Sequence, residues 1–294
     1  MAKKPSKSVS KPKPNIKSES CSVSIDWPKS LSEFKVNSYQ QIETVVSGMI
    51  YVLPHFFSPK LCDDLIRFFE TTSNLNENSR VPSKNKLNFT TTEMPPKKDY
   101  AARVNDRAMV EDARLARLLW IQLKSCLLSE NTSEYFNNDN EEELPNEERE
   151  QRENFQDCIG LNDNLRIYRY IPGHYFGQHY DESVKASVLP LDGTQVRKSG
   201  ETHWTLLIYL TGETEGEVSG GGTIFYPNEH EAATYGKTNR TSQSSGKSSV
   251  VHVKTQKGML LLHKHGDDCF LHEGEKVTGG VKWIFRSDLV YPLT

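Results

Sequence analysis

The spacing of hydrophobic positions changes along the chain. In the first half they recur every three or four residues, which is typical of amphipathic helices. Ser58 and Pro59 form a helix start, because serine caps the first turn and proline suits the first helical position. The apolar positions that follow are Leu61, Leu65, Phe68 and Phe69. A second helix is predicted over about residues 112–128, with Leu115, Leu118, Leu119 and Leu123 on its inner face.

From Asn164 onward the apolar period becomes two. The short runs LRIYRYI, WTLLIYL, GTIFYP, GMLLLH and VKWIFRSDLVY are rich in β-branched and aromatic residues and are separated by glycine and polar residues. Such runs predict strands. Helices followed by many strands predict an α+β, mainly β chain, with an antiparallel barrel or sandwich as its core.

Three polar segments interrupt this pattern. Residues 1–20 carry six lysines and no acid before Glu19, so this segment cannot bury enough apolar surface to fold. Residues 130–153 contain ten acidic residues against two arginines, and residues 228–250 are polar and of low complexity. We therefore predict a disordered tail over 1–44 and a single domain over 45–294, with helical support over 45–160, a β core over 161–294 and exposed insertions near 130–153 and 228–250.

Composition excludes several classes of protein. The net charge of −3 argues against a core built to hold nucleic acid, although the lysine-rich tail could bind a polyanion, direct nuclear import or simply aid solubility. Five cysteines without a C-x-x-C pair exclude zinc ribbons and disulfide scaffolds. The absence of a long apolar run and of a signal-type start predicts a protein that is not secreted, has no membrane partner and resides in the cytoplasm, the nucleus or both.

The segment RYIPGHYFGQHYDES contains a candidate metal site. His179 and Asp181 stand two apart at the end of a predicted strand, so both side chains can face the same ion. A third ligand must come from elsewhere, and LLHKHGDDCFLHEGEKVTGG offers His263, His265 and His272. Two histidines and one carboxylate form the facial triad of non-haem Fe(II) oxygenases, although the spacing alone leaves zinc open.

A candidate anion site follows on the last predicted strand. Lys282, Ile284 and Arg286 share one face, while Trp283 and Phe285 share the other. A cation inside an apolar barrel is costly unless it meets an anion, which a bound dicarboxylate would supply. Either cation could be that partner, and Lys282 is favoured by its spacing of ten from His272. Tyr170 could add a hydroxyl to the same carboxylate or be a core tyrosine.

These motifs together resemble the 2-oxoglutarate- and Fe(II)-dependent dioxygenases, in particular their prolyl 4-hydroxylase-like branch. RYIPGHYFGQHYD matches the R-Y-x-x-G-x-x-[YF]-x-x-H-x-D pattern of that branch, and LHEGEKVTGGVKW matches its distal H-x-G with a basic residue ten positions on. The resemblance covers about residues 165–291. It implies a double-stranded β-helix (jelly-roll) fold, iron ligation by His179, Asp181 and His272, and binding of 2-oxoglutarate by Lys282 and Tyr170. His265 remains a rival third ligand.

The resemblance also implies an activity. With Fe(II), O2 and ascorbate as reductant, 2-oxoglutarate would be converted to succinate and CO2 while a substrate carbon is hydroxylated. A prolyl or other side chain of a protein or peptide is the first choice of substrate. A nucleic acid or small molecule is the second, and a non-catalytic jelly-roll binding module is the third. Phe176 departs from the family tyrosine near the first iron histidine, and RVNDRA (residues 103–108) receives no role.

Overall fold

The computed structural model describes residues 25–37, 40–75, 86–96, 101–128, 146–227 and 250–293. Its helices are α1 (Lys29–Ser32), α2 (Pro59–Thr72), α3 (Ala113–Leu127), α4 (Asn146–Phe155) and a short 3-10 helix (Gly266–Asp268). Its strands are β1 (Glu43–Val46), β2 (Ile50–Leu53), β3 (Thr90–Met94), β4 (Arg103–Glu111), β5 (Gly160–Leu161), β6 (Asn164–Tyr170), β7 (Tyr175–His179), β8 (Lys185–Val188), β9 (Lys198–Tyr209), β10 (Val218–Gly220), β11 (Thr223–Tyr226), β12 (Val251–Val253), β13 (Leu260–Lys264), β14 (Leu271–Gly274), β15 (Val277–Gly280) and β16 (Lys282–Pro292).

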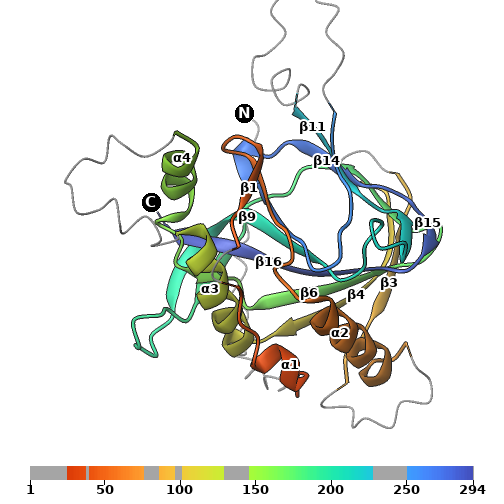
Figure 1. Ribbon diagram of the computed structural model, residues 1–294, viewed down its shortest axis with the longest axis horizontal. Helices are drawn as coiled ribbons and strands as arrows, with labels where there is room; N and C mark the ends of the chain where they lie inside the picture. The colour runs from red at the N-terminus through yellow and green to blue at the C-terminus, as the bar shows by residue number, and fades with distance from the viewer. Residues whose placement is uncertain are drawn as a thin grey trace, which may run out of the picture.

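The strands form one large sheet that curls around an interior (Figure 1). Its order is β1-β2-β13-β9-β16-β6-β4-β7-β14-β11-β12, while β3, β5 and β8 pair with β4, β16 and β9. Strands β10 and β15 form a separate pair. Neighbours in the order run antiparallel and, apart from pairs such as β1 and β2, most are far apart in sequence, as β6 and β16 are. The predicted mainly β jelly-roll is confirmed.

Helices α1, α2 and α3 lie on one outer side of the barrel, beside β16, β6 and β4 and away from β11 and β14 (Figure 1). The two predicted helix starts are confirmed. Ser58 Oγ accepts the main-chain N–H of Leu61 at 3.2 Å, and Asp112 Oδ1 accepts those of Arg114 and Leu115 at 3.0 Å. The helices bury their apolar faces in one large cluster with the outer face of the sheet.

Strand β16 separates two apolar layers. Trp283 and Phe285 belong to the cluster shared with the helices, whereas Ile284 belongs to a second cluster inside the barrel with Tyr170 and Tyr209. This alternation confirms the two faces predicted for the strand. Lys282 and Arg286 therefore project to the interior side, where the candidate site lies.

Ordered structure begins earlier than Val45, where we expected its start. Helix α1 and its flanking residues are part of the fold, because a few apolar side chains anchor an otherwise polar segment. Leu31 is buried, Phe34 packs against Phe56 and Phe57 with ring centroids 5.2 and 5.0 Å apart, and Trp27 Nε1 donates to Asp112 Oδ2 at 2.9 Å. The lysine-rich segment over 1–20 lies outside the described residues.

The acidic insertion also differs from the expected loop in its second part. Residues 146–155 form helix α4, whose first turn carries Glu147 and Glu148, where acidic side chains favour helix formation. Phe155 at its end is fully buried and packs on Trp204 with ring centroids 4.9 Å apart. The first part of this insertion and nearly all of the predicted insertion near 228–250 lie outside the described residues. Within the described ranges, the structure contains no helix long and apolar enough to cross a membrane.

Candidate active site

Three of the predicted ligands converge on one point. His179 ends β7, Asp181 lies two residues beyond that strand, and His272 lies on β14. Strands β7 and β14 are paired, with His272 directly opposite His179. His179 Nε2 lies 3.7 Å from Asp181 Oδ1, and His272 Nε2 lies 3.8 Å from Asp181 Oδ2. One donor atom from each of the three lies within 4.8 Å of the other two, a separation that fits binding to a single ion.

Both histidines present the nitrogen that a metal needs. His179 Nδ1 lies 2.8 Å from the carbonyl oxygen of Gly177, and His272 Nδ1 lies 2.9 Å from that of Phe270. A carbonyl oxygen only accepts, so each Nδ1 carries the hydrogen and each Nε2 keeps its lone pair. Burial lowers the pKa of His179 to about 4 and also lowers the pKa of His272. Both rings are therefore neutral at pH 7.

Asp181 remains a carboxylate inside the protein. Burial opposes its ionisation, but the Arg286 guanidinium and the neighbouring His272, His179 and His263 together outweigh this effect and hold the pKa of Asp181 well below its usual range. Arg286 Nη2 and Thr205 Oγ1 both donate to Asp181 Oδ2, at 2.9 and 2.8 Å. Oδ2 is thereby engaged by two donors, and Oδ1 faces His179. The donor set of two neutral imidazoles and one carboxylate fits Fe(II) in a facial arrangement.

The predicted anion site contains a buried lysine. Lys282 is only 2% exposed, and its Nζ lies 5.2 and 5.6 Å from the ring centroids of Tyr170 and Tyr209. Among the described residues, none forms a hydrogen bond or ion pair with this ammonium group. Burial lowers the pKa of Lys282 to about 7, and the Glu275 carboxylate opposes the shift only in part. A carboxylate bound beside Nζ would restore the usual charge.

A glycine makes room for the lysine. Gly221 has φ of +77°, and a Cβ at this position would lie 3.0 Å from Lys282 Cδ. The glycine-rich turn between β10 and β11 therefore lets the lysine stem pass and supplies a backbone conformation that side chains disfavour.

Tyr170 is the cross-strand partner of Lys282. Its hydroxyl oxygen lies 3.4 Å from Asn105 Nδ2. An amide nitrogen only donates, so the hydroxyl hydrogen of Tyr170 stays available for a second acceptor. Asn105 comes from the RVNDRA segment, which forms β4. Sequence analysis missed this contact because the two residues meet only through β-strand pairing.

The remaining candidates have other contacts. Arg286 donates to Asp181 and Asp288, so Lys282 is the more available cation of the two. His265 uses both ring nitrogens on threonine hydroxyls, Nδ1 with Thr205 and Nε2 with Thr202, each at 2.9 Å. It lies beside the ligand cluster rather than in it.

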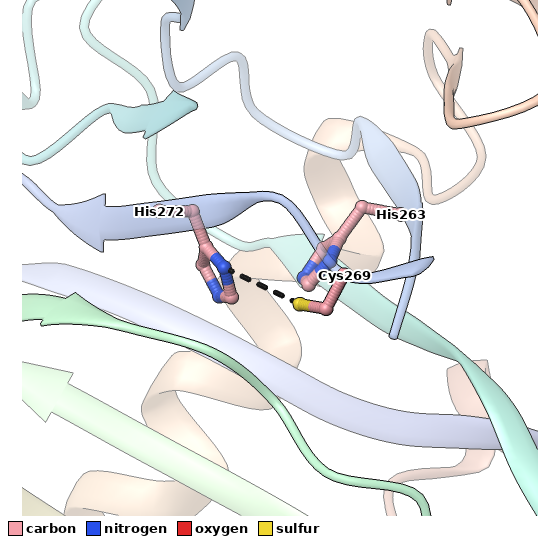
Figure 2. Close-up of side chains that lie close together, drawn as sticks. All are labelled: His263, Cys269 and His272. Carbon is pink, nitrogen blue, oxygen red and sulfur yellow. Dashed lines mark hydrogen bonds between the residues drawn. The ribbon is translucent and has the colours of Figure 1, made fainter. Parts of the chain in front are cut away.

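A second cluster shares His272 (Figure 2). His263, Cys269 and His272 lie together, and Cys269 Sγ is 3.9 Å from His272 Nδ1. Burial raises the pKa of the Cys269 thiol to about 12, and the thiol donates to the carbonyl of Phe270 at 3.4 Å. His272 faces this thiol with its protonated Nδ1. The cluster therefore lines the first site without forming a second one.

Comparison with known proteins defines the class. Residues 165–287 match the sequence model of the 2OG-Fe(II) oxygenase superfamily. This part of the chain carries the sequence signature of that superfamily, which indicates a 2-oxoglutarate-dependent dioxygenase. The superfamily uses Fe(II), 2-oxoglutarate and O2. No curated protein matches the chain.

Several solved structures are distantly similar. A viral collagen prolyl hydroxylase from Paramecium bursaria Chlorella virus-1 is 17% identical, with 84% of this chain and 97% of that chain covered and a TM-score of 0.38. A prolyl-4-hydroxylase from Pseudomonas putida is 12% identical, with coverage of 85% and 95% and a TM-score of 0.42. A prolyl hydroxylase from Trichoplax adhaerens, solved with a hypoxia inducible factor peptide, is 13% identical, with coverage of 83% and 84% and a TM-score of 0.42. None of these likenesses bears on the substrate.

Proposed function

We propose that this protein hydroxylates a carbon of a protein or peptide side chain, with proline as the first candidate residue. The observation that carries the proposal is the pairing of a His179–Asp181–His272 donor set with a buried, unneutralised Lys282 in one barrel. The donor set suits Fe(II), and Lys282 suits the distal carboxylate of 2-oxoglutarate. The motif resemblance to the prolyl 4-hydroxylase-like branch supports the choice of substrate.

The chain's own residues prepare the site in three ways. His179 and His272 would bind the metal through Nε2, and Asp181 through Oδ1. Lys282 would bind the distal carboxylate of 2-oxoglutarate, with the free hydroxyl hydrogen of Tyr170 as a second donor. The interior apolar cluster around them, which includes Tyr209 and Ile284, excludes water from the bound co-substrate. With Fe(II) and 2-oxoglutarate bound, O2 would supply the oxidising power for C–H hydroxylation, with one oxygen atom going to the substrate and the other to succinate as CO2 is released.

Succinate formation from 2-oxoglutarate tests the proposal. Purified full-length protein is incubated under air with Fe(II), with and without ascorbate, beside His179→Ala. We expect metal-dependent succinate that is absent in the variant and increased by ascorbate. Anaerobic titrations with Fe(II) and then 2-oxoglutarate separate binding from turnover. Failure of both to bind would contradict the proposal and leave a non-catalytic jelly-roll module.

Substrate class needs a separate measurement. Proline-containing peptide pools are incubated with the enzyme, and mass spectrometry reports the gain of one oxygen atom and the residue that carries it. Hydroxylated proline dependent on His179 supports the proposal. Stimulation of succinate formation by a nucleic acid or small molecule, with unmodified peptides, would instead favour the second choice of substrate.

A further inference from the structure

A row of buried hydrogen bonds ends on the carboxylate of Asp181. Thr205 Oγ1 contacts Asp181 Oδ2 at 2.8 Å and His265 Nδ1 at 2.9 Å. His265 Nε2 contacts Thr202 Oγ1 at 2.9 Å, and Thr202 Oγ1 in turn accepts the main-chain N–H of Val184 at 3.0 Å. Thr202 and Thr205 are fully buried, and His265 is 5% exposed.

The chemistry of these groups fixes which atom donates and which accepts in each hydrogen bond of the row. An ionised carboxylate only accepts, so the Thr205 hydroxyl donates to Asp181. The hydrogen of Thr205 is then used, and its oxygen must accept from His265 Nδ1–H. Burial lowers the pKa of His265, so the ring is neutral and its Nε2 accepts from the Thr202 hydroxyl. The Thr202 oxygen remains free to accept from Val184, whose main-chain nitrogen can only donate.

The row acts on one oxygen of the ligand. Thr205 and Arg286 both donate to Oδ2, which lies 3.8 Å from His272 Nε2, whereas Oδ1 lies 3.7 Å from His179 Nε2. A carboxylate held in this way has one oxygen free for a metal and cannot rotate to offer the other without breaking two hydrogen bonds. Partners beyond the direct ligands commonly orient them and tune their affinity.

We propose that Thr205 and His265 are positioning residues of the metal centre, which hold Asp181 as a monodentate ligand through Oδ1. The proposal rests on the proposed function, because it takes Asp181 as a metal ligand. It also explains why His265, a sequence-level rival to His272, lies next to the centre without joining the donor set.

The first test uses the metal-free protein. A long-range 1H–15N correlation spectrum reports which nitrogen of each histidine carries hydrogen. We expect His265 to be neutral with hydrogen on Nδ1, and we expect this tautomer preference to weaken in Thr205→Val. Hydrogen on Nε2 of wild-type His265 would overturn the proposal, whatever the stability of the variants.

The second test measures metal affinity in the absence of O2, with Co(II) as a spectroscopic substitute and Fe(II) as the native candidate. Thr205→Val keeps the shape of the side chain and removes the hydroxyl, whereas Thr205→Ser keeps the hydroxyl. We expect affinity to fall roughly 10–100-fold in the valine variant and to be restored in the serine variant. The ligand-field spectrum of bound Co(II) should change in the valine variant as well.

Thr211→Val is the matched control. Thr211 is also buried, but its Oγ1 accepts the main-chain N–H of Trp283 rather than contacting Asp181. We expect lower stability and unchanged metal affinity. Wild-type affinity in Thr205→Val, while His179→Ala binds no metal, would overturn this proposal alone. Equal binding by wild type and His179→Ala would instead contradict the metal centre itself.

Discussion

His272 is the direct cross-strand partner of His179 in the β7–β14 pair. This register brings the two ring centroids to 4.2 Å and turns both Nε2 atoms towards Asp181. The candidate metal centre therefore depends on one pairing between strands that are remote in sequence. Each of the two rings supplies one donor atom, and neither has a substitute within the triad.

Removing either ring should abolish tight metal binding. For His179→Ala or His272→Ala we expect a loss larger than the roughly 10–100-fold effect of removing an outer partner. Isothermal titration with Fe(II) under argon measures it. His203→Ala is the control, because the His203 ring stacks on Tyr291 at a centroid distance of 4.8 Å and forms no hydrogen bond or ion pair with the triad among the described residues. Equal affinities for all three variants would contradict the assignment.

Lys282→Met should weaken binding of 2-oxoglutarate without weakening binding of the metal. Loss of one charge-assisted contact costs about 1.5–3 kcal/mol, or roughly a 10- to 150-fold rise in Kd. Lys276→Met is the matched control, since Lys276 also lies over a tyrosine ring, that of Tyr175, at 5.5 Å but on the surface. An unchanged Kd for Lys282→Met would remove the lysine from the co-substrate site.

Binding of 2-oxoglutarate should also take up protons. Burial lowers the pKa of Lys282 to about 7, so at pH 8 the free site is mostly neutral. A bound carboxylate favours the charged amine, and we expect uptake approaching one proton per ligand. Titration calorimetry in buffers of different ionisation enthalpy measures the uptake. It should vanish in Lys282→Met, and its persistence there would assign the proton to another group.

Lys282 should also make the free energy of unfolding of the metal-free protein depend on pH. Its pKa is lower in the folded state than in the unfolded chain, so the unfolded chain binds more protons between about pH 7 and about pH 10. This group therefore makes stability rise with pH across that window. Urea unfolding of wild type and Lys282→Met should show a flatter profile for the variant. Parallel profiles would contradict the lowered pKa.

Arg286→Gln should destabilise the fold strongly. The change leaves the buried Asp181 carboxylate without its guanidinium partner, which typically costs about 3–5 kcal/mol. Lys198→Gln is the contrast, because the Lys198–Asp192 pair is exposed and water screens such pairs, so that we expect little loss of stability. Urea denaturation compares the two, and similar small losses would mean that water already screens Asp181.

Gly221→Ala should cost more than Gly216→Ala. Their φ angles are +77° and +73°, so both changes carry a backbone penalty of about 1–2 kcal/mol. A new Cβ at position 221 would meet Lys282 Cδ, whereas nothing lies within 4 Å of one at position 216. We expect an additional loss of stability and of 2-oxoglutarate affinity only for Gly221→Ala. Equal effects would show that the lysine stem moves aside freely.

Much of the framework was predictable because it follows from local pattern. The helix start at Ser58 rests on capping by that residue, the second helix on the spacing of its leucines, and the strands after residue 164 on the period of two. The alternation of side chains along β16 was enough to predict that Lys282 faces the interior of the barrel. His179, Asp181 and His272 stood out through motif spacing, although only the β7–β14 register brought them together.

Other features depended on contacts that sequence spacing does not contain. The burial of Leu31 and Phe155 drew two polar segments into the fold, since a single large apolar side chain can anchor a short helix. Arg286 lies on the face of β16 that the sequence predicts to be shared with Lys282. Its ion-pair partner Asp181 follows β7, and the spacing along the sequence does not reveal that the two residues meet. The sequence alone determined the candidates for metal and anion chemistry, with His265 as a rival to His272 and Arg286 as a rival to Lys282. Tertiary structure decided which of them meet, because strand pairing places Thr205 and His265 behind Asp181 and gives Lys282 no ion-pair partner among the described residues.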